Sequence, residues 1–297
     1  MKVSVIIPVF NESNLDIVLK SLQNQRNIEK YLFEVIIVND GGKDFYQLEN
    51  NPFGYPLKYV KHEGNLGRSA ARNTGVRHSE SDLLIFMDGD RIPNPEFIAR
   101  HVNANNEYPG NKVVIGNPVE LLCPDIDMIR NAVDTMFDDK NHKIWKYVYN
   151  QNYAELISKI FTGVKTKCDI EWAAFFSANF SIKKELYCQV GGFDEKYCQW
   201  GYENMDLGIQ LQKIGVDFYF LEHNVNFHIF HKQDRGVNLL GKEYILTKYD
   251  KRNDIIRFFD FLEGNISLHD FTGKNDDQSK STYFSQTKLG SKYRYSF

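Results

Sequence analysis

Two carboxylates separated by one glycine, in Asp88-Gly89-Asp90, are the part of this sequence that points most directly to chemistry. They follow the apolar run 83–87, which predicts a strand buried on both faces. Residues i and i+2 of a strand point the same way, so both acids can face one point. Such a pair favours a hard divalent cation, Mg2+ or Mn2+, completed by phosphate oxygens of a substrate. The alternative is a solvated turn, since Asp-Gly is a common turn dipeptide.

The elements around this pair predict an α/β fold with a doubly wound, mainly parallel sheet. Strand-like apolar runs occupy residues 3–9, 33–38, 57–60 and 83–87. A helical pattern follows residues 11–14, and the segment 64–73 is typical of a glycine loop that enters a helix. Strands that alternate with helices in this way build a parallel sheet, whose ligands bind at the carboxyl edge. We therefore expect the polar residues at the strand ends to meet there.

The second half of the sequence has weaker patterns. Residues 117–170 predict a helical insertion or lid, and residues 173–182 and 225–230 predict strands. A helix from residue 203 onward should turn Leu207, Leu211 and Ile214 inward. We expect one domain over residues 1–235, divided into 1–116, the insertion 117–170 and 171–235, and then a C-terminal helical extension with a partly mobile tail, 236–297.

Composition excludes several classes of protein. The formal charge of −3 and the absence of a basic cluster argue against nucleic acid as a partner. No apolar stretch approaches the ~18 residues of a transmembrane helix. The four cysteines have no CxxC spacing, and no signal peptide is recognisable. We expect a cytoplasmic protein with reduced thiols, and leave peripheral association with a membrane open; the oligomeric state is not determined by these features.

Four motifs in order resemble the nucleotide-sugar half of family 2 glycosyltransferases with the GT-A fold. These motifs are residues 3–12, 38–41, 64–73 and 88–90. Residues 191–195 and 200–207 resemble the acceptor-side motif shared by polypeptide N-acetylgalactosaminyltransferases, β-1,4-galactosyltransferases and bacterial chondroitin-type synthases. The resemblance covers about residues 1–235, so that 1–116 would be the nucleotide-sugar half and 171–235 the acceptor-side half.

This resemblance implies a set of residues that bind the donor nucleotide. Acids at strand ends would accept hydrogen bonds from uracil and ribose, and an arginine would reach the diphosphate as a fixed fork of donors. The residues concerned are Pro8, Val9, Glu12, Asp40, Arg72, Asp88 and Gly89. A capping role for Glu12, a turn role for Asp40 and a solvated Arg72 are the structural alternatives.

The resemblance also implies a metal site. Asp90 would ligate Mn2+ or Mg2+, with Asp88 touching the ribose or the metal. His228 lies where the aminosugar-transferring relatives place a histidine ligand, and His231 is the second choice. The bound cation would neutralise the departing UDP.

For catalysis, an inverting enzyme needs a carboxylate that takes the proton of the acceptor hydroxyl. Glu203 is the predicted base and Asp206 the alternative. Asn204 occupies the position of the acid regarded as the base in galactosyltransferases, and the Glu-Asn pair resembles that of the retaining polypeptide N-acetylgalactosaminyltransferases. Trp200 would be a platform for a sugar, or else a core residue.

The predicted function is therefore a metal-dependent glycosyltransferase of bacterial polysaccharide or glycoconjugate synthesis. It would move a hexose or N-acetylhexosamine from a UDP-sugar to a hydroxyl of a saccharide or lipid-linked saccharide, with inversion favoured over retention. A protein or peptide acceptor stays open. So do a sugar-nucleotide nucleotidyltransferase and a non-catalytic nucleotide-sugar-binding protein. The donor sugar and the acceptor are not set by the motifs.

Overall fold

The structure is a computed structural model that describes residues 1–29, 32–45, 51–139, 142–150, 152–161, 163–165, 168–198, 201–231 and 239–273. Trp200 and the tail beyond residue 273 lie outside the described residues. The strands are β1 (Lys2–Val9), β2 (Leu32–Asn39), β3 (Leu57–Lys61), β4 (Leu83–Met87), β5 (Arg91–Pro93), β6 (Lys112–Leu121), β7 (Val148–Asn150), β8 (Asn179–Lys183) and β9 (Asp217–Ile229). The α-helices are α1 (Leu15–Gln23), α2 (Arg68–His78), α3 (Phe97–Glu107), α4 (Ile126–Ala132), α5 (Asn152–Ile160), α6 (Lys184–Gln189), α7 (Glu203–Lys213), α8 (Leu239–Lys248), α9 (Asn253–Leu262) and α10 (Leu268–Thr272), with short 3-10 helices η2 (Lys143–Tyr147) and η3 (Glu171–Ala174).

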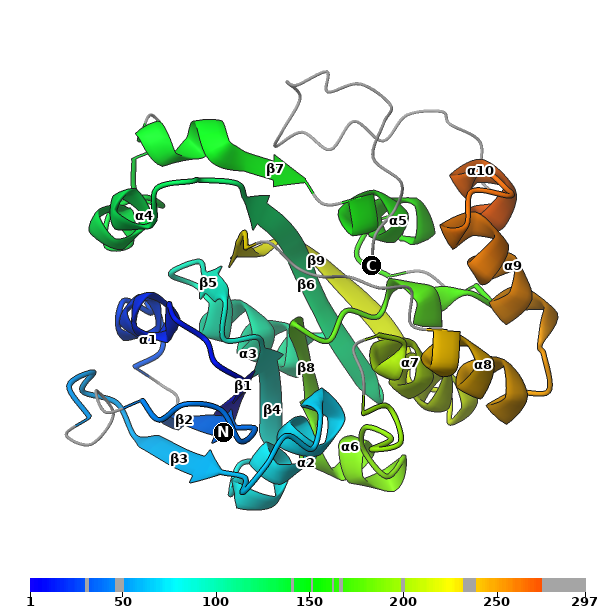
Figure 1. The fold of residues 1–297 in the computed structure, drawn as a ribbon, viewed down its shortest axis with the longest axis horizontal. Helices are drawn as coiled ribbons and strands as arrows, with labels where there is room; N and C mark the ends of the chain where they lie inside the picture. The colour runs from blue at the N-terminus through cyan, green and yellow to red at the C-terminus, as the bar shows by residue number, and fades with distance from the viewer. Residues whose placement is uncertain are drawn as a thin grey trace.

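One sheet runs through the molecule in the order β3-β2-β1-β4-β8-β6-β9-β5, with β7 paired to β6 (Figure 1). Strands β3, β2, β1 and β4 are parallel, as the sequence predicts, and β6 is parallel to β9. Strand β8 is antiparallel to both of its neighbours, β4 and β6. Two reversals cancel, so β6 and β9 point the same way as β1, β2 and β4. Their carboxyl ends therefore lie along one edge.

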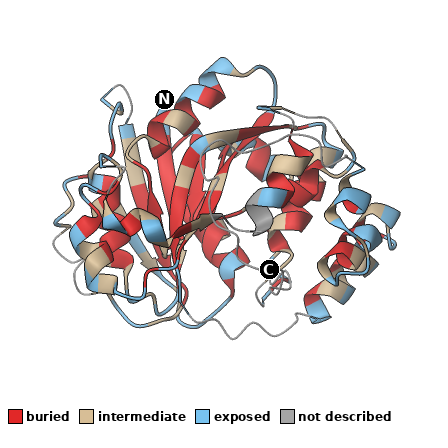
Figure 2. Cartoon of the chain, turned by 90° about the horizontal axis from the view of Figure 1, so that it is seen from above, coloured by how far each residue is buried: buried red, intermediate tan, exposed pale blue. Residues whose placement is uncertain are grey.

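The central strands β1, β4, β6 and β8 are buried on both faces, which explains the uninterrupted apolar runs of β1 and β4 (Figure 2). In β4, alternate side chains enter different cores: Leu83, Ile85 and Met87 join the core with α1, α3 and α4. Leu84 and Phe86 join the core formed with α5, α6, α7 and the C-terminal helices. Helices on both sides of a parallel sheet confirm the predicted α/β, doubly wound class.

Several predicted boundaries differ from those of the structure. Strand β6 continues to Leu121 and is held by β9 throughout, past the expected start of the insertion at residue 117. The predicted strand 173–182 was wrong over its first part, because residues 171–174 form η3 and only residues 179–183 pair with β4. The inward position predicted for Ile214 was also wrong: it caps the end of α7 and is 40% exposed.

The C-terminal helices α8 and α9 pack against α7 and η3. Ile245, Tyr249 and Phe258 belong to the same core as Leu207 of α7 and Trp172 of η3. Figure 1 shows α8 beside α7 and α9 beyond it. Among the described residues, no helix has the length and apolar character needed to cross a membrane.

A buried polar network joins α3 to β8. His101 Nε2 lies 3.0 Å from Asn179 Oδ1, and its Nδ1 lies 2.9 Å from Ser181 Oγ. The imidazole is fully buried, and burial lowers its pKa to about 4 because the charged form would lose its hydration. The unfolded chain protonates His101 near its ordinary pKa, so between these values the unfolded state binds more protons than the folded state.

We therefore expect acidification to destabilise the fold through His101. The contribution of the neutral His101 to the free energy of unfolding is fully present above pH ~6.5. It falls by ~2 kcal/mol on going to pH ~5 and stops changing below the pKa of His101 in the folded state. Chemical denaturation at a series of pH values measures it. His101→Gln should flatten the profile between these values, whereas His78→Gln, which changes an exposed histidine of α2, should leave the shape of the profile intact. An equally steep profile in His101→Gln would contradict this account.

Candidate functional site

A carboxylate and two imidazoles meet at the carboxyl edge of the sheet. One oxygen of Asp90 and one ring nitrogen each of His228 and His231 lie within 4.8 Å of one another. Asp90 Oδ2 is 3.2 Å from His228 Nε2 and 3.2 Å from His231 Nε2. Strand pairing brings them together, because Arg91 of β5 lies opposite His228 of β9 and the Ile229 amide donates to the Asp90 carbonyl.

Asp90, His228 and His231 shift one another's pKa values. Burial would raise the pKa of Asp90, but the two histidines and Arg91 hold it well below its usual range. Burial would lower the pKa of His228, yet Asp90 and Glu120 raise it to about 9. The hydrogen bond to Asp90 also raises the pKa of the half-exposed His231. Without a metal, the ionised form of Asp90 and the charged forms of the two imidazoles therefore stabilise one another.

The group fits a divalent cation. Asp90 Oδ1 is buried and accepts no hydrogen bond from the described residues, so this carboxylate keeps unused lone pairs. One carboxylate with two imidazoles is a mixed oxygen and nitrogen set, which suits Mn2+ better than Mg2+, an ion that prefers oxygen ligands. Asp88 is not part of this group of three.

Glu120 is a residue of this site that the sequence did not reveal. Its Oε2 lies 2.7 Å from His228 Nδ1, on the side of the ring away from Asp90. Glu120 and His228 are register partners on the parallel strands β6 and β9. A carboxylate in this position fixes the orientation and tautomer of a metal-binding histidine. The alternation of buried Val119 and Leu121 around Glu120 was the available signal that the strand continues.

Arg72 of α2 is completely buried and bridges two acids. Its Nη2 donates to Asp88 Oδ1 at 2.9 Å and its Nη1 to Glu203 Oε1 at 3.1 Å. The guanidinium also lies over the ring of Phe193, 5.0 Å from its centroid. Burial disfavours the cation, but the two carboxylates more than compensate and raise the pKa of Arg72. Arg72 thus connects the end of β4 to the start of α7.

The end of β1 packs closely on the acidic pair. A Cβ on Gly89 would lie 2.5 Å from a methyl group of the buried Val9, so only glycine fits between the two acids. Pro8, the preceding residue of β1, is half-buried. Glu12 accepts a hydrogen bond from the Asn14 amide, next to the start of α1. Burial and the neighbouring Asp90 raise the pKa of Glu12, which places this carboxylate in the field of the cluster.

Asp40, at the end of β2, organises the glycine loop. Its Oδ1 accepts hydrogen bonds from the Leu66 amide and His62, and its Oδ2 accepts one from the Gly67 amide. Its side chain is only 6% exposed. Both carboxylate oxygens are therefore engaged with the segment that leads into α2, which fixes the loop beside the sheet edge.

The acids of α7 lie in different surroundings. Glu203, at the first turn, accepts from Arg72 through Oε1 and from the Gly201 amide through Oε2. Asp206 is fully buried and accepts from Lys248 at the end of α8, from Tyr249 directly after it and from Gln210. Only Glu203 is joined through Arg72 to Asp88.

Asn204 has a partner of its own. Its side-chain amide donates to the Phe175 carbonyl at 2.8 Å, which ties the start of α7 to the segment before β8.

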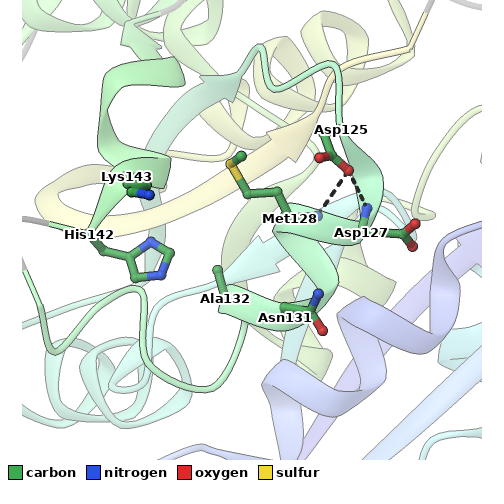
Figure 3. Close-up of a pocket in the computed structure, with 7 residues that line it drawn as sticks. All are labelled: Asp125, Asp127, Met128, Asn131, Ala132, His142 and Lys143. Atoms are coloured by element: carbon green, nitrogen blue, oxygen red, sulfur yellow. Dashed lines mark hydrogen bonds between the residues drawn. The ribbon is translucent and has the colours of Figure 1, made fainter.

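A separate cavity of about 370 Å3 lies between α4 and η2 (Figure 3). It is lined by Asp125, Asp127, Met128, Asn131, Ala132, His142 and Lys143. Asp125 caps α4 by accepting from the amides of Asp127 and Met128. None of these residues belongs to the metal-ligand group, so the cavity is separate from that group.

Known proteins resemble this chain in sequence and in fold. A glycosyltransferase of Haemophilus influenzae, itself uncharacterised, is 35% identical over 275 residues, which cover 86% of this chain and 80% of the relative. A chondroitin synthase of Pasteurella multocida is 26% identical over 239 residues, which cover 76% of this chain. The crystal structure of GalNAc-T7 with UDP, GalNAc and Mn2+ superimposes with a TM-score of 0.61 over 90% of this chain and 52% of that one, at 15% identity. This likeness confirms the GT-A fold.

The chain is shorter than most of these relatives. It spans 24% of the chondroitin synthase and between 24% and 65% of five further curated relatives. Residues 159–232 match the N-terminal domain of galactosyltransferase. Residues 4–176, more than half of the chain, match glycosyl transferase family 2. The protein therefore belongs to family 2 of the glycosyltransferases.

Proposed function

We propose that this protein transfers a hexose or N-acetylhexosamine from a UDP-sugar to a hydroxyl of a saccharide or lipid-linked saccharide. The observation that carries the proposal is the meeting of Asp90, His228 and His231 at the sheet edge, beside the acids that Arg72 joins. The UDP, GalNAc and Mn2+ bound by GalNAc-T7, a protein of the same fold, support the choice of donor and metal. The relative named chondroitin synthase supports a saccharide acceptor.

The donor would lie along the carboxyl edge. Asp90 and the two histidines would hold the cation, with Glu120 orienting His228. When bound, the cation would stabilise the charge that develops on the departing nucleoside diphosphate. The end of β1, with Pro8, Val9 and Glu12, would border the nucleotide.

Two predicted nucleotide residues take different roles in this proposal. Asp40 acts on the nucleotide through the glycine loop, because both of its oxygens hold loop amides or His62. Arg72 likewise acts through its two carboxylate partners, because its guanidinium is completely buried. Both would order the site before the substrate binds.

Glu203 is the carboxylate that we assign to the acceptor hydroxyl. It lies at the start of α7 and is linked through Arg72 to the acidic pair, whereas Asp206 is enclosed by α8. As the base of an inverting transfer, Glu203 would take the hydroxyl proton as the oxygen attacks the anomeric carbon. Its bonds to Arg72 and to the Gly201 amide use one lone pair on each oxygen, so lone pairs are left for the acceptor hydroxyl.

The metal site is tested by removing its carboxylate. We expect Asp90→Asn to weaken Mn2+ binding, measured calorimetrically with UDP present, by more than the roughly 10–100-fold that loss of an outer partner costs. Release of UDP from UDP-sugars should fall with it. Asp127→Asn, which neutralises an exposed acid of α4, is the matched control and should leave both quantities unchanged. Mn2+ affinity that is unaltered in Asp90→Asn would refute the metal assignment.

The role of Glu203 is tested by an isosteric change. Glu203→Gln cannot accept the proton, so we expect turnover to fall by roughly 100- to 10,000-fold while the affinity for UDP and Mn2+ stays the same. Steady-state kinetics and UDP titration measure the two effects. NMR of the first product formed gives the anomeric configuration, and retention would exclude the base role. A loss of UDP affinity equal to the loss of turnover would mean that Glu203 serves binding alone.

A further inference from the structure

One lysine of the C-terminal extension, Lys248, binds two carboxylates that lie on either side of Glu203 in the chain. Lys248 Nζ of α8 donates to Asp194 Oδ2 at 2.7 Å and lies 2.8 Å from Asp206 Oδ1. Asp194 comes before Glu203 in the chain, and Asp206 lies three residues after it, in the first turn of α7. A single ammonium group therefore binds a carboxylate on each side of Glu203 in the chain.

Two tyrosines, one in α8 and one directly after it, bind the same two carboxylates. The Tyr244 hydroxyl donates to Asp194 Oδ2 at 2.7 Å, and the Tyr249 hydroxyl, one residue past the end of α8, donates to Asp206 Oδ1 at 2.8 Å. Asp206 has no exposed surface and Lys248 is 25% exposed. Because a buried carboxylate left without its partners is strongly unfavourable, these bonds hold α8 firmly to α7.

A third contact reaches the residue next to Glu203. Tyr202 has a left-handed backbone with φ of 70°, which is unusual for a residue with a side chain. Its ring packs edge-on against Phe259 of α9, with centroids 5.2 Å apart. A strained backbone persists only where its surroundings fix it, and here α9 supplies that support directly before the start of α7.

We propose that α8 and α9 form a clamp that sets the position of Glu203, with Lys248 as its principal positioning residue. The inference rests on the proposed function, because the clamp matters for the reaction only if Glu203 acts on the acceptor hydroxyl. It assigns to residues 239–262 a part in the reaction although none of the contacts above reaches the metal-ligand group. Removing the clamp should leave donor binding intact and misplace the carboxylate that acts in the transition state.

The first test replaces the ammonium group and keeps the aliphatic stem. We expect Lys248→Met to lower kcat for UDP release by about 10- to 100-fold, the range caused by small misplacements of a reacting group, with KM for the UDP-sugar unchanged. The assay uses whichever of UDP-glucose, UDP-galactose and their N-acetylamino counterparts turns over fastest. Lys251→Met, at an exposed lysine three residues further on, is the control and should keep the original kcat. An unchanged kcat in Lys248→Met overturns the proposal.

The second test asks whether Lys248 acts through Glu203. In a Glu203→Gln background, Lys248→Met should lower kcat no further, because the group that it positions is already disabled. Fully multiplicative effects of the two changes would overturn the proposal. If Lys248→Met does not fold, Tyr249→Phe removes one hydroxyl from the same carboxylate and takes its place in the cycle.

A third measurement separates the clamp from the proposed function. If Glu203→Gln keeps full turnover, the assigned role of Glu203 fails, but the clamp can still be judged by hydrogen exchange of the amides of residues 201–206. Faster exchange in Lys248→Met, with UDP affinity unchanged, supports the clamp. Exchange equal to that of the unmodified protein overturns it.

Discussion

The rest of the site depends on one interaction, in which the buried guanidinium of Arg72 pairs with two carboxylates, Asp88 and Glu203. A cation with no exposed surface is tolerated only while its carboxylate partners stay in place, and those partners come from the end of β4 and the start of α7. Asp88 and Glu203 are far apart in the chain. Arg72 therefore joins the end of β4 to the start of α7, and its guanidinium also lies over the ring of Phe193.

Around this connection the sheet edge carries an unusual concentration of charge. Asp90, Glu120 and Glu12 supply negative charge, and His228, His231 and Arg91 oppose it. The shifted pKa values of Glu12, Asp90, His228 and His231 follow from burial, from neighbouring charges and from hydrogen bonds. A site in which charges are pre-arranged in this way costs little reorganisation when a charged leaving group forms.

Buried charged groups are fixed by their partners also where the C-terminal helices meet α7. Lys248 and Tyr249 meet a carboxylate that the sequence offered as an alternative base, and their contacts account for its complete burial. Residues that looked interchangeable in sequence, Glu203 and Asp206, thus occupy different environments. One turn of α7 separates an acid joined to the sheet edge from an acid that anchors α8.

The sequence by itself determined the local structure of the first half. Apolar runs of strand length predict buried strands, and acids that directly follow such parallel strands lie at the carboxyl edge of the sheet. It also carried the family motifs, because these are short and contiguous. Only the tertiary structure decided which distant groups meet. The pairing of β5 with β9 places Asp90 beside His228, and the register of β6 with β9 brings Glu120 behind that imidazole. Such pairings depend on the packing of the whole sheet, since spacing along the chain does not encode distance across strands.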